Sequence, residues 1–231
     1  MTTTLITGAN KGLGFETARR LIEAGHTVYV GARDARRGQA AAAKLGARFV
    51  RIDVTDEDSV KAAAAFVRED VGRLDVLVNN AGIGGAGKLV GEVTGADMQT
   101  TYDTNVFGVV RVTHAFLPLL EASDAPVVVN VSSGLGSLAA CADPGRIEFQ
   151  VALLDYNSSK TALVMVTSQY AKAYAAIRFN AVDPGYTATD LNGHRGTSSV
   201  EEGAEIIVRM ATIGAHGPTG GFFDEAGPVV W

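Results

Sequence analysis

A glycine-rich stretch near the start of the chain, residues 7–14 (TGANKGLG), restricts the possible folds more than any other feature. Residues 3–6 before it are apolar and are predicted to form a strand, and residues 15–24 after it are predicted to form a helix. A strand, a glycine-rich turn and a helix in this order can hold the phosphates of a dinucleotide. The glycines permit a tight bend, close approach of the backbone to the pyrophosphate and close packing of the helix on the strand. The helix start also offers free N–H groups and the positive end of its dipole to the anion. Because the glycine pattern alone is a weak signal, the hypothesis depends on the remainder of the chain.

Strand-like and helix-like segments alternate along that remainder. Predicted strands cover residues 27–32, 48–52, 74–79, 127–131, 177–182 and 221–223. Predicted helices cover residues 36–45, 98–120, 155–176 and 200–210, together with a helix that Thr55 caps and that ends near residue 71. Pro118 is expected to kink or end the helix in which it lies. The inner strands are continuous apolar runs, which indicates burial on both faces. The pattern therefore predicts one α/β domain over residues 1–231 with a doubly wound parallel sheet.

Composition limits the possible partners. Of the 231 residues, 47% are hydrophobic, enough for a sizeable core, and the net charge of −5 argues against a broad surface for nucleic acid or anionic membranes. An anion site must therefore be local, and the cations that could form one are Lys11, Arg33, Arg36 and Arg37. The single cysteine, Cys141, excludes an intrachain disulfide and fits a reducing compartment. No apolar run is long enough to span a bilayer, and no spacing of His, Cys or carboxylates is typical of a metal site. The chain is predicted to be a soluble cytoplasmic protein without a bound metal.

The end of the second predicted strand bears on the choice of dinucleotide. A fold that selects NAD usually has an acidic residue there for the ribose hydroxyls, whereas one that selects NADP has a neutral residue and a nearby Arg for the 2′-phosphate. Here the strand ends Gly31-Ala32-Arg33-Asp34. Asp34 follows Arg33 and opens a helix, so we interpret it as an N-cap. The guanidinium of Arg33 and the ammonium of Lys11 therefore predict NADP(H) rather than NAD(H).

Tyr156 and Lys160 lie four residues apart at the start of a predicted helix, so both side chains project from one face. A free tyrosine titrates near ~10, and a nearby ammonium is expected to lower that pKa. The pair could then donate a proton to a ketone oxygen that receives hydride, or take one from an alcohol. In isolation, such a pair is more often a half-buried aromatic beside a solvated lysine. Position favours the catalytic interpretation, because Ser133 and the glycine-rich turns also fall at the carboxyl ends of strands, where open α/β sheets bind ligands.

Six motifs resemble those of the short-chain dehydrogenase/reductase family, and they extend from near the N-terminus almost to the C-terminus. They are TGANKGLG (7–14), NNAG (79–82), TNVFG (104–108), NVSSGLG (130–136), YNSSK (156–160) and DPGYTATD (183–190). The NKG of the turn and the GARDARRGQAA after the second strand are similar to the NADPH-dependent carbonyl reductase branch. The resemblance implies a single-domain Rossmann fold. Its doubly wound parallel sheet would have about seven strands in the order 3-2-1-4-5-6-7, with helices on both faces.

The resemblance also implies roles for individual residues. Tyr156 would be the acid/base, Lys160 would bind the nicotinamide ribose and tune Tyr156, and Ser133 would hold the substrate carbonyl oxygen. Asn105 would hold a backbone geometry and a water that completes the proton relay through Lys160. The implied cofactor-binding residues are Gly8, Asn10, Lys11, Gly12, Leu13, Gly14, Arg33, Asp53, Val54, Asn80, Ala81, Gly82, Tyr156, Lys160, Pro184, Gly185, Thr187 and Thr189.

Within this set, Asp53 and Val54 are expected to contact the adenine, and residues 80–82 to line the adenosine side. Thr189 and the backbone of residues 184–187 are expected to hold the carboxamide end. Plainer roles remain open for two residues: Asp53 could decorate a helix start, and Asn105 could satisfy a helix interior.

Two segments depart from the family pattern. Ser133 and Tyr156 lie 23 positions apart (156 − 133), more than in ordinary members, so a segment within about residues 139–154 is expected to loop out beside the active site. Monomeric carbonyl reductases carry a longer insert there that obstructs a helix-mediated dimer, so a homo-oligomer is possible but open. The short stretch rich in Gly, Ser, Thr and His between Thr189 and Val200 is expected to form a small, mobile lid.

These observations predict an NADPH-dependent oxidoreductase that reduces the carbonyl of a small aldehyde or ketone, or in reverse oxidises an alcohol. Two alternatives stay open: an NADP(H)-binding sensor without turnover, and an NAD-dependent alcohol dehydrogenase. Asn105, Ser133, Tyr156 and Lys160 argue together against the sensor, and the cations near the glycine turn argue against NAD. The fold alone does not identify the substrate.

Overall fold

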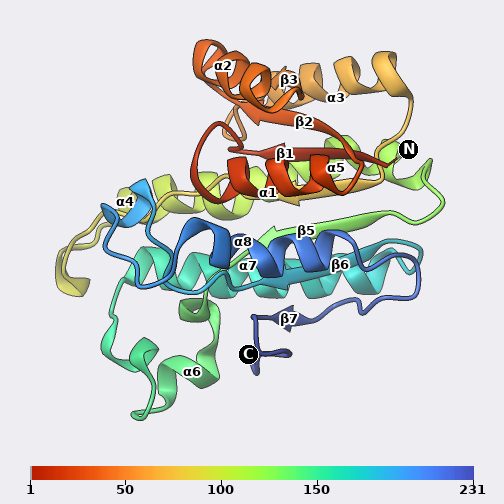
Figure 1. The fold of residues 1–231 in the computed structure, drawn as a ribbon. Helices are drawn as coiled ribbons and strands as arrows, with labels where there is room; N and C mark the ends of the chain where they lie inside the picture. Colours follow the sequence, from red (N-terminus) through yellow and green to blue (C-terminus); the bar gives the residue numbers. More distant parts are fainter. Residues whose placement is uncertain (1) are drawn as a thin grey trace.

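Seven parallel strands form one sheet in the computed structural model, which describes residues 2–231, and their order is β3-β2-β1-β4-β5-β6-β7 (Figure 1). The strands are β1 (Thr3–Thr7), β2 (Thr27–Ala32), β3 (Arg48–Arg51), β4 (Val76–Asn79), β5 (Val127–Val131), β6 (Arg178–Val182) and β7 (Phe222–Phe223). The order reverses between β1 and β4, which creates the crevice where doubly wound sheets bind ligands. The predicted strand order and fold class are confirmed.

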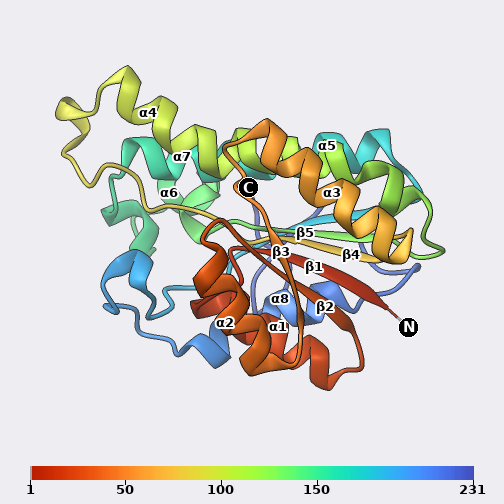
Figure 2. The same cartoon turned by 90° about the horizontal axis from the view of Figure 1, so that it is seen from above.

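Helices cover both faces of the sheet (Figure 2). One face carries α1 (Gly12–Glu23), α2 (Ala35–Leu45) and α8 (Val200–Ala211). The other carries α3 (Glu57–Val71), α5 (Gly108–Glu121) and α7 (Leu154–Ala173), with α4 (Gly95–Tyr102) before α5. In Figure 1 the carboxyl ends of the strands face the left side, where α4 and the short α6 (Leu138–Ala142) lie. None of the helices within residues 2–231 is long and apolar enough to cross a membrane.

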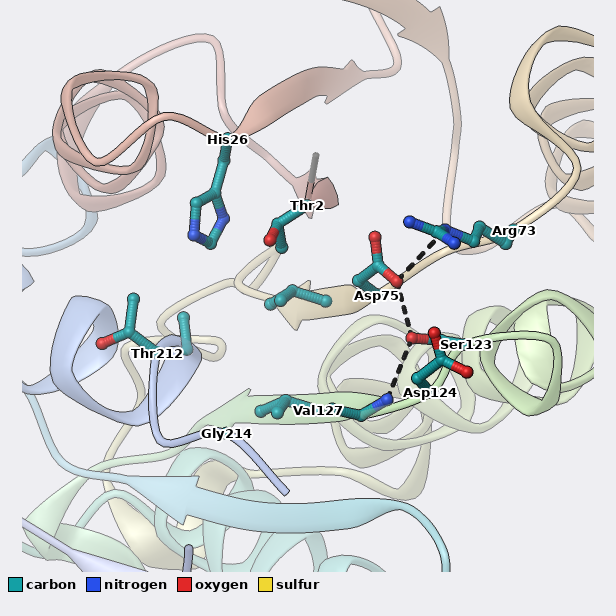
Figure 3. Close-up of a pocket in the computed structure, with 12 residues that line it drawn as sticks. Thr2, His26, Arg73, Asp75, Ser123, Asp124, Val127, Thr212 and Gly214 are labelled. Atoms are coloured by element: carbon teal, nitrogen blue, oxygen red, sulfur yellow. Dashed lines mark hydrogen bonds and ion pairs between the residues drawn. The ribbon is translucent and has the colours of Figure 1, made fainter. Parts of the chain in front are cut away.

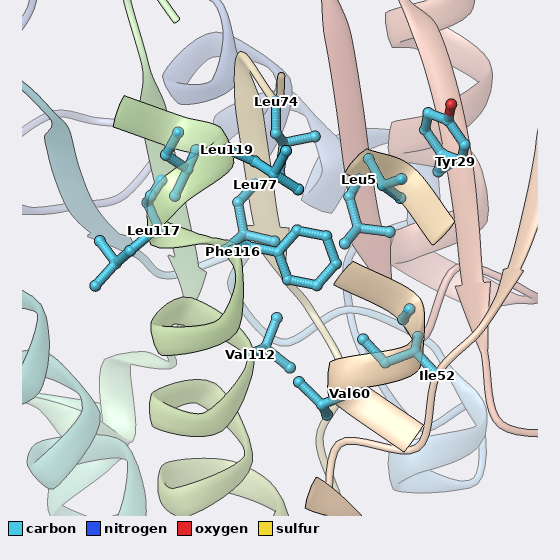
Figure 4. Packing of buried hydrophobic residues seen from close by; sticks show 14 of the residues in the cluster. Leu5, Tyr29, Ile52, Val60, Leu74, Leu77, Val112, Phe116, Leu117 and Leu119 are labelled. Atoms are coloured by element: carbon cyan, nitrogen blue, oxygen red, sulfur yellow. The ribbon is translucent and has the colours of Figure 1, made fainter. Parts of the chain in front are cut away.

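Two apolar cores pack on the two faces because neighbouring residues of a strand point in opposite directions. In β1, Leu5 joins the core under α3 and α5, whereas Ile6 joins the core under α1 and α8. Figure 4 shows the first core, in which the Phe116 ring lies among Leu5, Leu77 and Val112. Both cores are buried inside the sandwich, so the polar groups of the site collect at the strand ends.

Local differences from the sequence predictions have identifiable causes. Asp56, not Thr55, caps α3: its carboxylate accepts from the amides of Asp58 and Ser59. Thr55 instead donates its hydroxyl to Asp53 Oδ1 at 2.7 Å. An ionised carboxylate is a stronger acceptor for the helix N–H groups than a neutral hydroxyl.

The helix predicted over residues 98–120 consists of α4, a π-helical segment η2 (Asp103–Phe107), and α5. Pro118 lies inside α5 and does not end it. Leu117, Leu119 and Leu120 around it are all buried, and this packing offsets the hydrogen bond that a proline removes. The expected extra segment before Tyr156 contains α6 and a 3₁₀ turn, η4 (Ile147–Gln150).

Candidate active site

The glycine-rich turn joins β1 to α1, and two of its glycines adopt positive φ values. Gly8 and Gly12 have φ values of +66° and +55°, in the left-handed region that favours glycine. A Cβ on Gly14 would lie 2.4 Å from Asn80 Nδ2 and 2.8 Å from Gly8 O. Gly14 therefore permits the close approach of α1 to the loop after β4. Lys11 is the N-cap residue of α1 and makes no side-chain cap, which leaves the first helical N–H groups for an anion.

The loop after β4 is fastened to this turn. Asn80 Nδ2 donates to the carbonyls of Thr7 and Gly8, at 2.9 and 3.2 Å. The Thr7 hydroxyl accepts from the amides of Asn80 and Ala81, each at 3.0 Å. The loop then runs toward Lys160, since a Cβ on Gly82 would lie 3.7 Å from Lys160 Nζ. Asn80 thus acts on the protein backbone here, and its contact with adenosine stays a prediction.

A cavity of about 650 Å³ opens beside the glycine turn. Its cations are Lys11, Arg37 and Lys44, and the Lys44 ammonium lies 5.3 Å from the centre of the Phe15 ring. The cavity's other lining residues are Asn10, Gly12, Phe15, Ala40, Ala41 and Asp190. A hollow with several cations beside an uncapped helix start fits the phosphates of a dinucleotide. The structure therefore accommodates the predicted cofactor class.

Arg33, the residue expected to select NADP, is exposed at the end of β2 and does not line this cavity. Arg37, one turn into α2, does line it. Asp34 caps α2, as predicted, by accepting from the Arg37 amide at 2.9 Å. Lys44 is the cation that sequence reasoning missed. Lys44 lies seven residues after Arg37, a spacing that places both side chains on one face of the helix, and this spacing could have indicated its position beside Arg37.

Tyr156 and Lys160 share one face of α7, and Lys160 Nζ lies 5.6 Å from the centre of the Tyr156 ring. Lys160 is 6% exposed, and Nζ donates to the Val131 carbonyl at the end of β5, at 2.8 Å. Burial lowers the pKa of Lys160 to about 8 against an opposing effect of Asp183. Burial raises the pKa of Tyr156 to about 12 against a hydrogen bond from Ser133. The expectation of a lowered tyrosine pKa is therefore wrong for this structure, because desolvation of the phenol and the negative charge of Asp183 outweigh the opposing effect of Ser133.

Ser133 lies at the start of a 3₁₀ turn, η3 (Gly134–Gly136), directly after β5. Its hydroxyl accepts from the Leu135 amide at 3.3 Å and hydrogen bonds with Tyr156. The turn packs tightly on α7, since a Cβ on Gly136 would lie 2.9 Å from the Lys160 carbonyl. The structure thus brings Ser133, Tyr156 and Lys160 together, as predicted.

Asn105 lies in the π-helical segment η2 and is 1% exposed. Its side chain exchanges two hydrogen bonds with the Ile83 backbone, at 2.9 and 3.0 Å. It also donates to the Ser159 hydroxyl at 3.1 Å. The extra residue of a π turn re-aims a side chain, and here it lets one amide join the loop after β4 to α7. The backbone role expected for Asn105 matches these contacts, and the water relay stays a prediction.

The segment after β6 closes the site from a third side. Thr187 is buried and donates its hydroxyl to the Pro184 carbonyl at 2.9 Å, around Gly185 with φ +70°. Thr189 lies over the glycine turn, where a Cβ on Gly12 would approach its Cγ2 to 3.7 Å. The expected lid begins as a 3₁₀ turn, η5 (Asp190–Asn192), and Asp190 pairs with Lys11 at 2.5 Å.

The two residues predicted to contact adenine, Asp53 and Val54, also make contacts with other parts of the protein. Asp53 Oδ1 accepts from the amide and hydroxyl of Thr55, so its carboxylate serves the turn before α3. Val54 is buried, and a Cβ on Gly108 at the start of α5 would lie 2.9 Å from its Cγ2. Leu13 packs toward α8, where a Cβ on Gly203 would lie 2.9 Å from its Cδ2. For Asp53, the plainer role at a helix start agrees with the geometry.

Two carboxylates that sequence reasoning did not use converge on η3. A Cβ on Gly134 would lie 2.8 Å from both Asp183 Oδ2 and Glu148 Oε1. Burial raises the pKa of Asp183 against hydrogen bonds from the Gly185 and Gly134 amides. The extra segment before Tyr156 therefore contributes Glu148 to the surroundings of Ser133, which no motif indicated.

A smaller cavity of about 270 Å³ lies at the opposite edge of the sheet, at the amino ends of the strands (Figure 3). Its polar groups bind one another: Asp75 accepts from the Thr3 amide at 2.7 Å and the Ser123 hydroxyl at 2.6 Å. Doubly wound sheets bind ligands at the carboxyl ends, so we assign the site to the other edge.

Comparisons with known proteins agree with this geometry. A family profile described as "short chain dehydrogenase" matches residues 2–199. The chain is 33% identical to (-)-isopiperitenone reductase of Mentha piperita, with 95% of each sequence covered. It is 31% identical to salutaridine reductase of Papaver bracteatum, covering 95% of this chain and 93% of that protein.

Among solved structures, an NADPH-bound carbonyl reductase from chicken fatty liver superposes with a TM-score of 0.89 and 28% identity, covering 100% of this chain and 99% of that one. The profile match, the relatives, the strand order and the six motifs agree, and the chain belongs to the short-chain dehydrogenase family of oxidoreductases.

Proposed function

We propose that this protein is an NADPH-dependent reductase of aldehydes or ketones, with Tyr156 as the proton donor. The observation that carries the proposal is the meeting of Ser133, Tyr156 and Lys160 at the carboxyl end of β5, beside a glycine turn with a cation-lined cavity. The isopiperitenone, salutaridine and carbonyl reductases found by comparison support a carbonyl substrate. The cytoplasmic location, the absence of a nucleic-acid partner and the oligomeric state stay predictions.

NADPH, when bound, supplies the hydride for the carbonyl carbon, and this chain's residues handle the oxygen and its proton. With a pKa of about 12, Tyr156 keeps its proton at neutral pH and can donate it to the developing alkoxide. The Ser133 hydroxyl, which lies beside that phenol, can hold the substrate oxygen in the same place. Lys160 keeps one N–H on the Val131 carbonyl, and its remaining donors are available to a ribose hydroxyl.

The first experiment measures initial rates of NADPH oxidation at neutral pH over a panel of aldehydes, quinones and ketones, with NADH in parallel. We expect turnover of some carbonyls by the wild type and a loss of about 10²- to 10⁴-fold in kcat for Tyr156→Phe, because general acid catalysis is removed. Binding of NADPH, measured by fluorescence, should persist in the variant. Tight NADPH binding without turnover in the wild type would favour the sensor alternative, and oxidation of alcohols with NAD⁺ alone would favour the dehydrogenase alternative.

The cofactor preference is tested by substitutions around α2. We expect Arg37→Ala and Arg33→Ala each to lower the ratio of NADPH to NADH affinity, by about tenfold for a lost charge-assisted hydrogen bond. Arg36→Ala is the matched control, since Arg36 is exposed on the same helix, does not line the cavity and, unlike Arg33, is not among the predicted cofactor-binding residues. An unchanged ratio in both variants would contradict selection by these guanidinium groups.

A further inference from the structure

The loop after β4 contains a stretch, residues 82–86, that we call the wall segment because it runs between the catalytic pair and the lid. At its start, a Cβ on Gly82 would lie 3.7 Å from Lys160 Nζ. At its middle, a Cβ on Gly84 would lie 3.3 Å from the Leu191 carbonyl and 3.5 Å from Leu191 Cδ2. The wall segment therefore borders Lys160 at its start, and a shift of its later residues changes the surface against which η5 rests.

The far end of the wall segment is held by Asp155, the residue directly before Tyr156. Asp155 is 2% exposed, and its Oδ2 accepts from the Ala86 amide at 2.7 Å and from the Thr101 hydroxyl at 2.8 Å. A Cβ on Gly85 would lie 2.7 Å from each carboxylate oxygen, and Gly85 has φ +83°. The carboxylate thus fills the space beside Gly85 and binds the next residue, so α7, α4 and the wall segment meet at one side chain.

A buried carboxylate is costly unless its oxygens are well bonded, and the partners of Asp155 are a neutral amide and a neutral hydroxyl. The first turn of α7 lessens that cost, because the positive end of the helix dipole favours a negative charge there. Asn105 holds the opposite end of the wall segment through its two hydrogen bonds with the Ile83 backbone, so the segment is fixed at both ends.

We propose that Asp155 is a positioning residue that fixes the wall segment relative to Tyr156 and the lid, and that it thereby sets the affinity for the carbonyl substrate. The inference rests on the proposed function. Asp155 itself touches neither the reacting atoms nor the cofactor cavity; it acts through residues 84–86. The Tyr156 phenol, one residue further along α7, lies beside Ser133 rather than against residues 84–86, so we expect it to stay in place.

The first test compares Asp155→Ala and Asp155→Asn with the wild type. The Asn side chain can keep both contacts by placing its amide oxygen where Oδ2 lies, so that this oxygen accepts from the Ala86 amide and the Thr101 hydroxyl, and we expect it to restore most of the function. For Asp155→Ala we expect KM for the carbonyl substrate to rise about tenfold while kcat changes less than about threefold, the pattern of lost binding. Hydrogen–deuterium exchange without substrate should accelerate in the peptide spanning residues 82–91 and stay unchanged in the β-strand peptides.

The second test approaches the same contact from the loop. Gly85→Ala and Gly87→Ala both place a side chain at positive φ, +83° and +65°, but a Cβ on Gly87 meets nothing within 4 Å. We expect Gly85→Ala to reproduce the rise in KM and the faster local exchange, and Gly87→Ala to show little of either. The double variant Asp155→Ala/Gly85→Ala should be less impaired than the sum of the two single variants, because removing the carboxylate makes room for the methyl group.

Three outcomes would overturn the proposal: unchanged KM and exchange in Asp155→Ala, faster exchange throughout the sheet, or equal effects of Gly85→Ala and Gly87→Ala. The exchange experiment needs no turnover, so it reports on the wall segment even if no carbonyl is reduced. Failure of the wild type to reduce any carbonyl would contradict the proposed function, whereas normal exchange in Asp155→Ala would contradict only this inference.

Discussion

At the scale of single residues, Tyr156 and Lys160, the proposed catalytic pair, show how burial governs charge. Lys160 is buried and Tyr156 is half-buried, and desolvation disfavours the charged form of each. The pKa of the phenol therefore rises to about 12, while the pKa of the ammonium falls to about 8. At neutral pH the result is a protonated donor beside a cation, the arrangement that reduction of a carbonyl requires.

The lowered pKa of Lys160 makes a prediction about stability. Between about pH 8 and the ordinary lysine value of 10.5, the unfolded chain holds a proton that the folded chain has released. The unfolded state binds more protons in this window, so the contribution of Lys160 to the free energy of unfolding increases with pH. Between about pH 8 and about pH 10 we expect the wild type to gain about 2 kcal/mol relative to Lys160→Met.

Urea unfolding of both proteins at a series of pH values measures this difference, and the comparison cancels the other titrating groups. Lys172→Met, which changes a lysine in the last turn of α7, serves as the control and should give a constant difference from the wild type. A wild-type curve parallel to that of Lys160→Met would contradict the lowered pKa.

For single residues, prediction from the sequence was correct where the position of a side chain follows from its place within one helix. Tyr156 and Lys160 share a helical face, and Asp34 opens a helix, so short-range periodicity was enough. Asp155 could not be found in this way, because its partners lie 69 and 54 positions away in sequence. The direction of the Tyr156 pKa was missed because desolvation depends on the packed surroundings, which no local pattern contains.

At the scale of elements, the start of the segment expected to form a lid is positioned by an ion pair with the glycine turn. Lys11 in the turn and Asp190 in η5 form an exposed ion pair, and His194 Nε2 lies 2.8 Å from the other carboxylate oxygen. Hydrogen bonding to Lys11 holds the pKa of Asp190 below its usual value. The carboxylate of Asp190 therefore adds a negative charge to a cavity that is otherwise lined by cations. It also pairs with one of those cations, Lys11.

Asp190→Asn should therefore tighten NADPH binding. The substitution removes a charge that repels phosphate and frees Lys11, and for an exposed pair we expect an effect of about threefold in Kd. Isothermal titration of NADPH measures it, with Asp124→Asn as the control because Asp124 is an exposed acid at the opposite edge of the sheet. Weaker binding by Asp190→Asn would show instead that the ion pair helps to form the site.

Element-scale prediction was reliable where the apolar pattern was continuous. The valine-rich β5 has the predicted bounds, and the β1 and β6 predictions differ from the structure by only one residue at an end. The π-helical segment η2 was not predicted, because a π turn is maintained by the contacts of Asn105 with Ile83 and Ser159 rather than by its own composition. The 3₁₀ turns η3 and η4 were not predicted either.

At the scale of the whole molecule, charge is distributed unevenly, so the net charge does not describe the surroundings of the cavity. The chain carries a net charge of −5, yet the cavity beside the glycine turn gathers Lys11, Arg37 and Lys44 against the single acid Asp190. A cavity of one sign on a protein of the opposite sign concentrates an anionic ligand locally without attracting polyanions over the whole surface. This distribution agrees with the sequence-based argument that any anion site must be local.

The same distribution predicts how salt affects the two cofactors. NADPH carries a 2′-phosphate that NADH lacks, and the proposed partners of that group are partly exposed cations, whose attraction added salt screens. Raising the ionic strength from about 0.05 M to about 0.5 M should weaken NADPH binding by about tenfold and NADH binding by less than about threefold. Arg37→Gln should bring the salt dependence of NADPH toward that of NADH, whereas Arg36→Gln should leave it unchanged. Equal salt dependence for the two cofactors in the wild type would mean that the cavity's cations do not distinguish them, and the choice of cofactor would then have to come from another part of the site.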